Sequence, residues 1–123
     1  MIFVESQVIA SDNTQTRVVK CIRLLGGSNK KYATVSDFVI ITIKHRWAKR
    51  RWIFKKIYLA VIIGIKKEFR RLDGSYISSR NNRVLLLTEL GKIIGTRILG
   101  PIYKEIKQYA RISKLLMKSK GYV

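Results

Sequence analysis

The chain has 123 residues, with 26 Lys and Arg against 7 Asp and Glu, which gives a formal net charge of +19. This length fits one folded domain, and a hydrophobic content of 47% is enough for one modest core. So large a positive charge indicates a polyanionic partner, which leaves RNA, DNA and an anionic membrane surface as candidates.

The composition excludes several classes of protein. Apolar residues run through the whole chain and alternate with the charged ones, so the chain is not a disordered basic tail. The best apolar run, Ile57 to Ile65, is about half of the roughly 20 residues that a membrane-spanning helix needs. The single cysteine, Cys21, excludes an intramolecular disulfide framework. The N-terminal sequence MIFVESQVIASDN has no basic region ahead of an apolar stretch, so we expect no targeting segment.

The first 90 residues are rich in β-branched side chains, and turn-forming residues recur in them at short intervals. These turn signals are Asp12-Asn13, Gly26-Gly27-Ser28-Asn29, Ser36-Asp37, Asp73-Gly74 and Asn81-Asn82. Short strands separated by regular turns predict a mainly β fold, either a barrel or a sandwich.

Two of the predicted strands show an alternation of two residues. In VIITIK, Val39, Ile41 and Ile43 lie on one face, opposite the polar Thr42 and Lys44. A second run has Val61, Ile63 and Ile65 at the same spacing. We therefore expect one face of each strand in the core and the other toward solvent or a ligand.

The sequence after the strands predicts an arm and a helical end. Residues 66–83 predict a basic β-hairpin centred on Asp73-Gly74, a dipeptide suited to a tight turn. Beyond Gly100-Pro101, apolar residues follow helical spacing in two stretches, first Ile102, Ile106 and Tyr109, then Ile112, Leu115 and Leu116. We expect one domain over 1–123, with a barrel over about 1–100, short helices over about 101–118 and a frayed KSKGYV tail.

Residues suited to catalysis are scarce. The chain has one His and one Cys, and its seven carboxylates form no closely spaced pairs. His45 stands between Lys44 and Arg46, which suits phosphate contact or exposure better than general-base chemistry. His45 and Cys21 cannot supply a metal-ligand set, and GGSNKKY lacks the spacing of a nucleotide-binding loop. We therefore expect no catalytic residue, no metal and no cofactor.

Basic side chains gather in several clusters, and phosphate contact explains them best. A charge run is often only a solvated face, but cations packed this closely repel one another unless a polyanion neutralises them. Trp47 and Trp52 lie within one cluster and could stack on bases or pack against protein. A further pair is Arg80 with Arg83. Our candidate RNA-binding residues are Arg17, Lys30, Lys31, Lys44, Arg46, Lys49, Arg50, Arg51, Lys66, Lys67, Arg70 and Arg71.

Two rival functions remain at this level. A DNA-binding or architectural module would also be small and basic, and competition between duplex DNA and structured RNA separates the two. A membrane-surface protein would need a basic amphipathic helix with a wide apolar face. The basic runs here lie mainly in β-type sequence, which disfavours this alternative and membrane insertion.

Nearly the whole chain resembles the universal large-subunit ribosomal protein family called L-fourteen. The resemblance rests on segments in the same order: SDNTQTR (11–17), KCIRLLGGSNKKYA (20–33), DFVIITIK (37–44), AVII (60–63), Asp73-Gly74, Asn82 and GTRILGP (95–101). It implies a five-stranded β-barrel with a projecting hairpin and a small helical C-terminal part.

The resemblance also implies partners. Family members bind large-subunit ribosomal RNA at the subunit interface, help form bridges to small-subunit RNA, and neighbour ribosomal proteins of the L-three and L-nineteen types. A ribosome-silencing factor docks on the interface face in bacteria and organelles. By motif position, that face would contain Thr96, Arg97 and Lys114.

The chain departs from the family at a few places. Ser79 replaces an aromatic residue, Leu85 replaces Val, and residues 45–56 lack the Pro and Gly of bacterial members. This divergence, with a bias toward Ile and Lys, favours an organelle-encoded protein of the mitochondrial ribosome. A plastid or bacterial cytoplasmic ribosome is the alternative.

Overall fold

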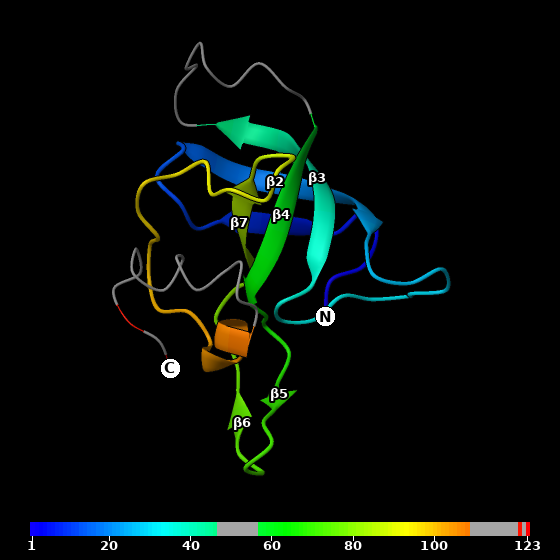
Figure 1. Ribbon diagram of the computed structural model, residues 1–123, viewed down its shortest axis with the longest axis vertical. Helices are drawn as coiled ribbons and strands as arrows, with labels where there is room; N and C mark the ends of the chain where they lie inside the picture. The colour runs from blue at the N-terminus through cyan, green and yellow to red at the C-terminus, as the bar shows by residue number, and fades with distance from the viewer. Residues whose placement is uncertain (47–56, 109–120, 122) are drawn as a thin grey trace.

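A closed β-barrel forms the body of the molecule. The computed structural model describes residues 1–46, 57–108, 121 and 123. Its barrel strands, in their order around the barrel, are β1 (Gln7–Ala10), β2 (Thr16–Leu24), β3 (Phe38–Arg46), β4 (Ile57–Gly64) and β7 (Arg83–Leu87) (Figure 1). Neighbouring strands are antiparallel except β1 and β7, which run parallel and close the barrel. The predicted five-stranded barrel is confirmed.

The long pair β2–β3 is irregular. Its register shifts between Thr16 and Val18, between Val18 and Val19, and again between Cys21 and Arg23. Such irregularities bend a strand and increase its twist, which helps a small sheet to curl into a barrel. The same bending sets the direction in which the β2 and β3 side chains leave the barrel wall.

The barrel core confirms one of the two predicted alternations and contradicts the other. In β3, Val39 and Ile41 are fully buried and Lys44 is exposed, as expected. In β4, Ile62 and Ile63 are both fully buried, so this strand has no solvent-facing side there. The core extends beyond the barrel strands, because Ile102, Tyr103 and Ile106, which follow Pro101, belong to the same hydrophobic cluster as Ile62 and Ile63.

The predicted hairpin arm is present. β5 (Phe69–Arg70) pairs with β6 (Tyr76–Ile77), and the two project away from the barrel (Figure 1). Gly74 has φ +86°, a conformation that glycine adopts without strain. Asp73 Oδ1 accepts hydrogen bonds from the Ser75 backbone N–H at 2.9 Å and from Ser75 Oγ at 2.6 Å. These bonds lower the pKa of Asp73 and fix the turn.

The C-terminal part has less helix than expected. Within the described residues it contains one 3-10 helix, η1 (Lys104–Gln108), beside the base of the hairpin (Figure 1). Ile102 does not join it, because Ile102 hydrogen-bonds to the main chain of Gly121 and Val123 instead. The predicted second stretch, over Ile112, Leu115 and Leu116, lies outside the described residues.

The expectation of a frayed tail is wrong for the two tail residues that are described. The Ile102 N–H donates to the Gly121 carbonyl at 3.2 Å, and the Val123 N–H donates to the Ile102 carbonyl at 2.9 Å. The Lys104 N–H then donates to the Val123 main-chain oxygen at 3.0 Å. Three backbone hydrogen bonds therefore hold Gly121 and Val123 against residues 102–104. No helix in the described part of the chain is long and apolar enough to cross a membrane.

Candidate nucleic-acid interface

One group of predicted RNA-binding residues meets where β2 begins and β3 ends. The register pairs Thr16 with Arg46 and Val18 with His45, so Arg17 lies beside the last residues of β3. Arg17, Lys44, His45 and Arg46 are all exposed, and we call them the strand-end cluster. The barrel wall fixes the spacing of these side chains at the main chain, which suits recognition of a rigid polyanion. The neighbouring predicted residues Trp47, Lys49, Arg50, Arg51 and Trp52 lie outside the described residues.

A second group lies at the base of the hairpin, and its members have different environments. Lys66, Lys67 and Arg70 are exposed. Arg71 is instead held in place: its Nε lies 2.8 Å from Glu105 Oε1, and its Nη2 donates to the main-chain oxygen of Val123. Arg71 therefore ties the hairpin to the C-terminal part, and a role in RNA contact stays a prediction.

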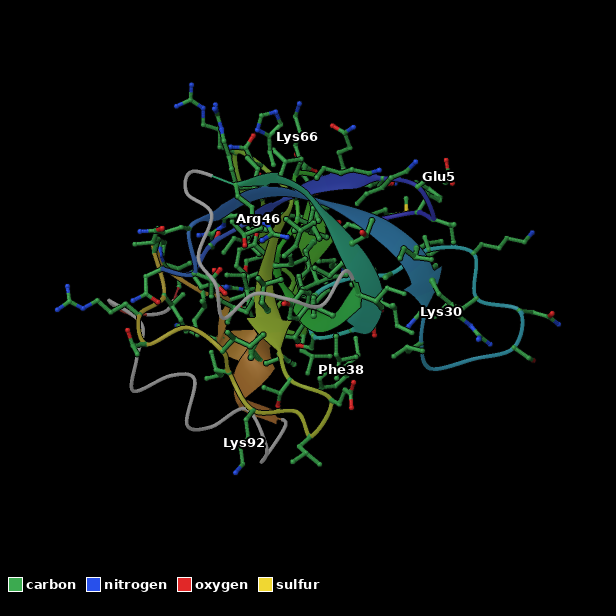
Figure 2. The ribbon with its side chains drawn as sticks, turned by 90° about the horizontal axis from the view of Figure 1, so that it is seen from above. Glu5, Lys30, Phe38, Arg46, Lys66 and Lys92 are labelled. Atoms are coloured by element: carbon green, nitrogen blue, oxygen red, sulfur yellow. The ribbon has the colours of Figure 1, made fainter. Side chains whose placement is uncertain are left out.

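The third group, Lys30 and Lys31, lies in the connection between β2 and β3. Lys30 Nζ lies 2.8 Å from Asp37 Oδ2 and donates to the Leu25 carbonyl at 3.3 Å. Lys30 thus holds its own loop together, whereas Lys31 is exposed. Figure 2 shows Lys30 at the right of the view, well away from Arg46. The structure does not gather the predicted residues into one surface but distributes them around the barrel.

The predicted interface residues Thr96 and Arg97 are anchored by Asn13. Asn13 Oδ1 accepts hydrogen bonds from the backbone N–H groups of Thr96 at 2.8 Å and Arg97 at 3.3 Å. Asn13 Nδ2 donates to Thr96 Oγ1 at 2.5 Å. One amide side chain thus fixes a segment 83 residues away, and it leaves Thr96 and Arg97 exposed. The third predicted interface residue, Lys114, lies outside the described residues.

The SDN turn and the GTR segment fit together closely. A Cβ atom on Gly95 would lie 2.9 Å from Asn13 Oδ1 and 3.0 Å from Asp12 Cβ, so no larger residue fits without movement. The Leu99 N–H donates to the Ser11 carbonyl at 2.7 Å, and Asp12 forms a β-bridge with Ile98. Two motifs that are distant in the sequence thereby form a single surface, which we call the GTR surface after its exposed residues Thr96 and Arg97.

Asp12 lies beneath this surface and is only 3% exposed. Its Oδ1 accepts from Thr14 Oγ1 at 2.5 Å and from the Thr14 N–H at 3.3 Å, while its Oδ2 accepts from the Leu86 N–H at 3.4 Å. Burial raises the pKa of Asp12, and the three hydrogen bonds oppose that rise without cancelling it. Asp12 therefore acts as a structural carboxyl group that links the turn to β7.

Arg83 has a role that the sequence did not suggest. The sequence pairs it with Arg80 as a basic cluster, but its guanidinium is half-buried between Gly64 and Gly100 and donates to the carbonyls of Leu99 and Pro101. A Cβ on Gly100 would lie 2.8 Å from Arg83 Nη1. Burial lowers the pKa of Arg83. The one available signal was its position directly before the apolar strand VLLL.

Two open hollows border these groups. One, of about 600 Å³, is lined by Asn13, Arg17 and Leu99, so it borders the strand-end cluster and the SDN turn. The other, of about 580 Å³, lies between the hairpin and η1 and includes Arg70 and Lys104. Within the described residues, no three His, Cys, Asp or Glu side chains come together as metal ligands would.

A comparison with protein families adds a finding to this geometry. The model of the family described as ribosomal protein L14p/L23e matches residues 1–120. The match covers nearly the whole sequence, so it includes the barrel, the hairpin and the paired SDN and GTR motifs.

Proposed function

Because the chain belongs to the ribosomal protein L14p/L23e family, and is therefore a structural protein of the large ribosomal subunit and not an enzyme, we propose that it binds large-subunit ribosomal RNA through its exposed cations. The strand-end cluster carries this proposal. Its residues come from two paired strands of a closed barrel, so little conformational freedom is lost when RNA binds.

The chemistry of the cluster fits a folded RNA backbone. Arg17 and Arg46 can each present two parallel N–H donors to a phosphate, and Lys44 adds a compact charge. Double-stranded RNA hides its deep major groove, so contacts to phosphates and 2′-hydroxyls dominate. The proposed recognition is therefore of RNA shape. The exposed Lys31, Lys66, Lys67 and Arg70 would extend the contact to other RNA segments.

Removal of two charges from the cluster tests this proposal. The double variant Lys44→Gln with Arg46→Gln should bind large-subunit RNA more weakly and with a flatter dependence on salt. Each lost phosphate contact lowers the slope of log affinity against log salt by roughly 0.7 to 0.9, so the double variant should lose about 1.4 to 1.8. Filter binding over a range of potassium concentrations measures the slope.

A matched control is Lys92→Gln, which removes an exposed cation at a different place on the barrel (Figure 2). Its slope should stay close to that of the parent protein. Equal slopes for the double variant and the parent would show that Lys44 and Arg46 do not contact RNA phosphates. If the native protein sedimented free of large subunits in magnesium, the assembly role itself would be wrong.

We further propose that the GTR surface faces the small subunit. Thr96 and Arg97 are exposed on a segment that Asn13 holds rigidly, and Lys114 is assigned to the same face by motif position. This surface would contact small-subunit RNA and would be the docking site for a ribosome-silencing factor. Ribosomal proteins of the L-three and L-nineteen types are the proposed protein neighbours.

The proposed location is the mitochondrial ribosome, on the basis of the Ile and Lys bias and the divergent residues 45–56. Fractionation of the source cells tests it. The chain should be recovered with large subunits from purified mitochondria, and recovery from plastid or bacterial ribosomes would replace this assignment.

A further inference from the structure

A small exposed apolar patch lies at the connection between β2 and β3, which leaves β2 at Leu24, whereas the strand-end cluster lies where β2 begins. Phe3, Val4, Ile22 and Tyr32 are 49%, 51%, 41% and 47% exposed. We call Phe3 and Tyr32, with Val4 beside them, the aromatic patch. Figure 2 shows Glu5 and Lys30, which lie close to these residues in the sequence, at the right of the view and away from Arg46. The patch is thus separate from the cations that carry the proposed RNA contact.

The two rings of the patch come from distant parts of the chain that the main chain joins. Ile2 and Ala33 form a β-bridge, with N–H to carbonyl distances of 3.0 and 2.8 Å. This bridge places Phe3 alongside Tyr32, with ring centroids 6.3 Å apart and planes tilted by 60°. Two tilted rings do not cover each other face to face, which is consistent with about half of each side chain being exposed.

The segment that carries Phe3 is held firmly. The Phe3 N–H donates to Ser6 Oγ at 3.0 Å, and the Glu5 N–H donates to the Cys21 carbonyl of β2 at 2.8 Å. Glu5 Oε2 lies 3.1 Å from Lys20 Nζ. A ligand that meets these rings therefore meets a surface that is already ordered, so binding costs little conformational entropy.

The chemistry beside the rings points to one kind of ligand. Lys31 directly precedes Tyr32 in the sequence and is exposed, and its side chain has no ion pair or hydrogen bond with the part of the chain that the structure describes. Exposed Ser28 and Asn29 precede it. Ring faces next to an unneutralised cation and small polar groups suit a nucleotide, whose base stacks while its phosphate meets the charge. The centre of a protein–protein interface, by contrast, is depleted of charge.

We infer that the aromatic patch stacks against an unpaired base of large-subunit ribosomal RNA, with Lys31 on an adjoining phosphate. The inference rests on the proposed RNA-binding function and adds to it a contact of a different kind. The strand-end cluster would neutralise phosphates of folded RNA, whereas the patch would hold a base that has left its helix. The barrel would then contact ribosomal RNA from two sides.

The test uses the full chain and large-subunit ribosomal RNA. Tyr32→Leu removes the ring from an exposed position, and Tyr32→Phe is the matched control because it keeps the ring. Stacking on one base contributes roughly 1–3 kcal/mol, so Tyr32→Leu should weaken binding at least about fivefold. Because no charge changes, the slope against salt should remain that of the parent. Tyr32→Phe should bind like the parent.

The outcomes separate this inference from the proposed function. If Tyr32→Leu binds as tightly as the parent while Lys44→Gln with Arg46→Gln binds weakly, the aromatic patch does not contact RNA and the proposed function stands. If the parent itself shows no salt-dependent binding, the proposed function fails. Unchanged RNA affinity together with easier release of Tyr32→Leu from assembled subunits would assign the patch to a protein neighbour and overturn the inference.

Phe3→Leu guards against an effect on folding. It removes the second ring and leaves every residue of the β2–β3 connection unchanged. It should weaken RNA binding, as Tyr32→Leu should. Urea unfolding of both leucine variants should match that of the parent, since both side chains are about half exposed. Weaker binding by an equally stable variant supports stacking, and unchanged binding by both variants contradicts it.

Discussion

At the scale of single residues, polar side chains that bond to the main chain carry more of this structure than the sequence indicated. Asp12, Asn13 and Arg83 each bond to the main chain of a segment far away in the sequence. The closest match to a sequence expectation is the Asp73-Gly74 turn, because a turn depends on neighbours along the chain. The role of Arg83 could not be predicted, since its acceptors, the Leu99 and Pro101 carbonyls, become neighbours only in the folded barrel.

Asp12 makes stability depend on pH in a direction opposite to that of a salt-bridged carboxylate. Its pKa is raised in the folded state, so between the unfolded value of about 3.9 and the folded value the native protein binds more protons. The stabilisation from this group is present below pH 3.9 and is lost as the pH rises through the folded pKa. Asp12→Asn removes this titration.

We therefore expect the free energy of unfolding of the parent, minus that of Asp12→Asn, to fall as the pH rises from about 4 to 7. Urea unfolding at several pH values measures both. The subtraction cancels the titration of the other carboxylates, which the two proteins share. A constant difference over this range would show that Asp12 titrates normally in the folded protein.

At the scale of elements, the strands and turns could be predicted from the sequence. The packing of the C-terminal segment against the barrel and the hairpin could not. Residue alternation in β3 and the turn at Asp73-Gly74 are local signals, and both are confirmed. The double burial of β4 was missed because the hydrophobic cluster that contains Ile62 also includes apolar residues after Pro101, whose position depends on tertiary packing. For the same reason, the pairing of Arg71 with Glu105 turned a predicted surface cation into a structural one.

The ion pair between Arg71 and Glu105 should contribute measurably to stability because it is mostly shielded from water. The two side chains are 17% and 22% exposed. Glu105→Gln leaves the Arg71 guanidinium without its counter-charge, so we expect a loss of about 1–3 kcal/mol in the free energy of unfolding. Urea denaturation measures this loss, and faster hydrogen exchange of the Arg71 amide would report loosening of the hairpin.

Glu68→Gln is the matched control, since Glu68 is exposed near the same hairpin. It should change the stability by less than about 0.5 kcal/mol. If the two glutamine variants unfolded at the same urea concentration, the ion pair between Arg71 and Glu105 would not contribute to stability.

At the scale of the whole molecule, the three surfaces for which we propose contacts lie at different places on the barrel. The strand-end cluster, the aromatic patch and the GTR surface arise from different strands and loops, and a rigid barrel holds them at fixed separations. The net charge of +19 indicated a polyanion but could not indicate how the cations are distributed. That distribution depends on which strand ends and loops come together, which only the closed topology determines.

The GTR surface leads to a prediction about subunit joining. Arg97→Glu should still assemble into large subunits, because the Arg97 contact to Asn13 uses its backbone N–H and not its guanidinium. Joining to small subunits should weaken about tenfold, since a negative side chain would face phosphates. Gradient sedimentation at lowered magnesium measures the joined fraction. Arg97→Lys keeps the charge and should join nearly normally; a joining defect equal to that of Arg97→Glu would contradict a charge contact.

The parallel pairing of β1 with β7 has a consequence for the folding of the protein during its synthesis. Ile9 pairs with Arg83 and Ala10 with Val84, so the barrel cannot close until the chain has been synthesised past residue 84. Until then β1 and β4 have unpaired edges, in a chain whose cations already attract any nearby RNA. Pairing between such distant segments is slow, because the intervening loop must be closed first. Pairing of β1 with β7 is therefore the step after which the exposed cations hold fixed positions, and it should precede stable incorporation into the large subunit.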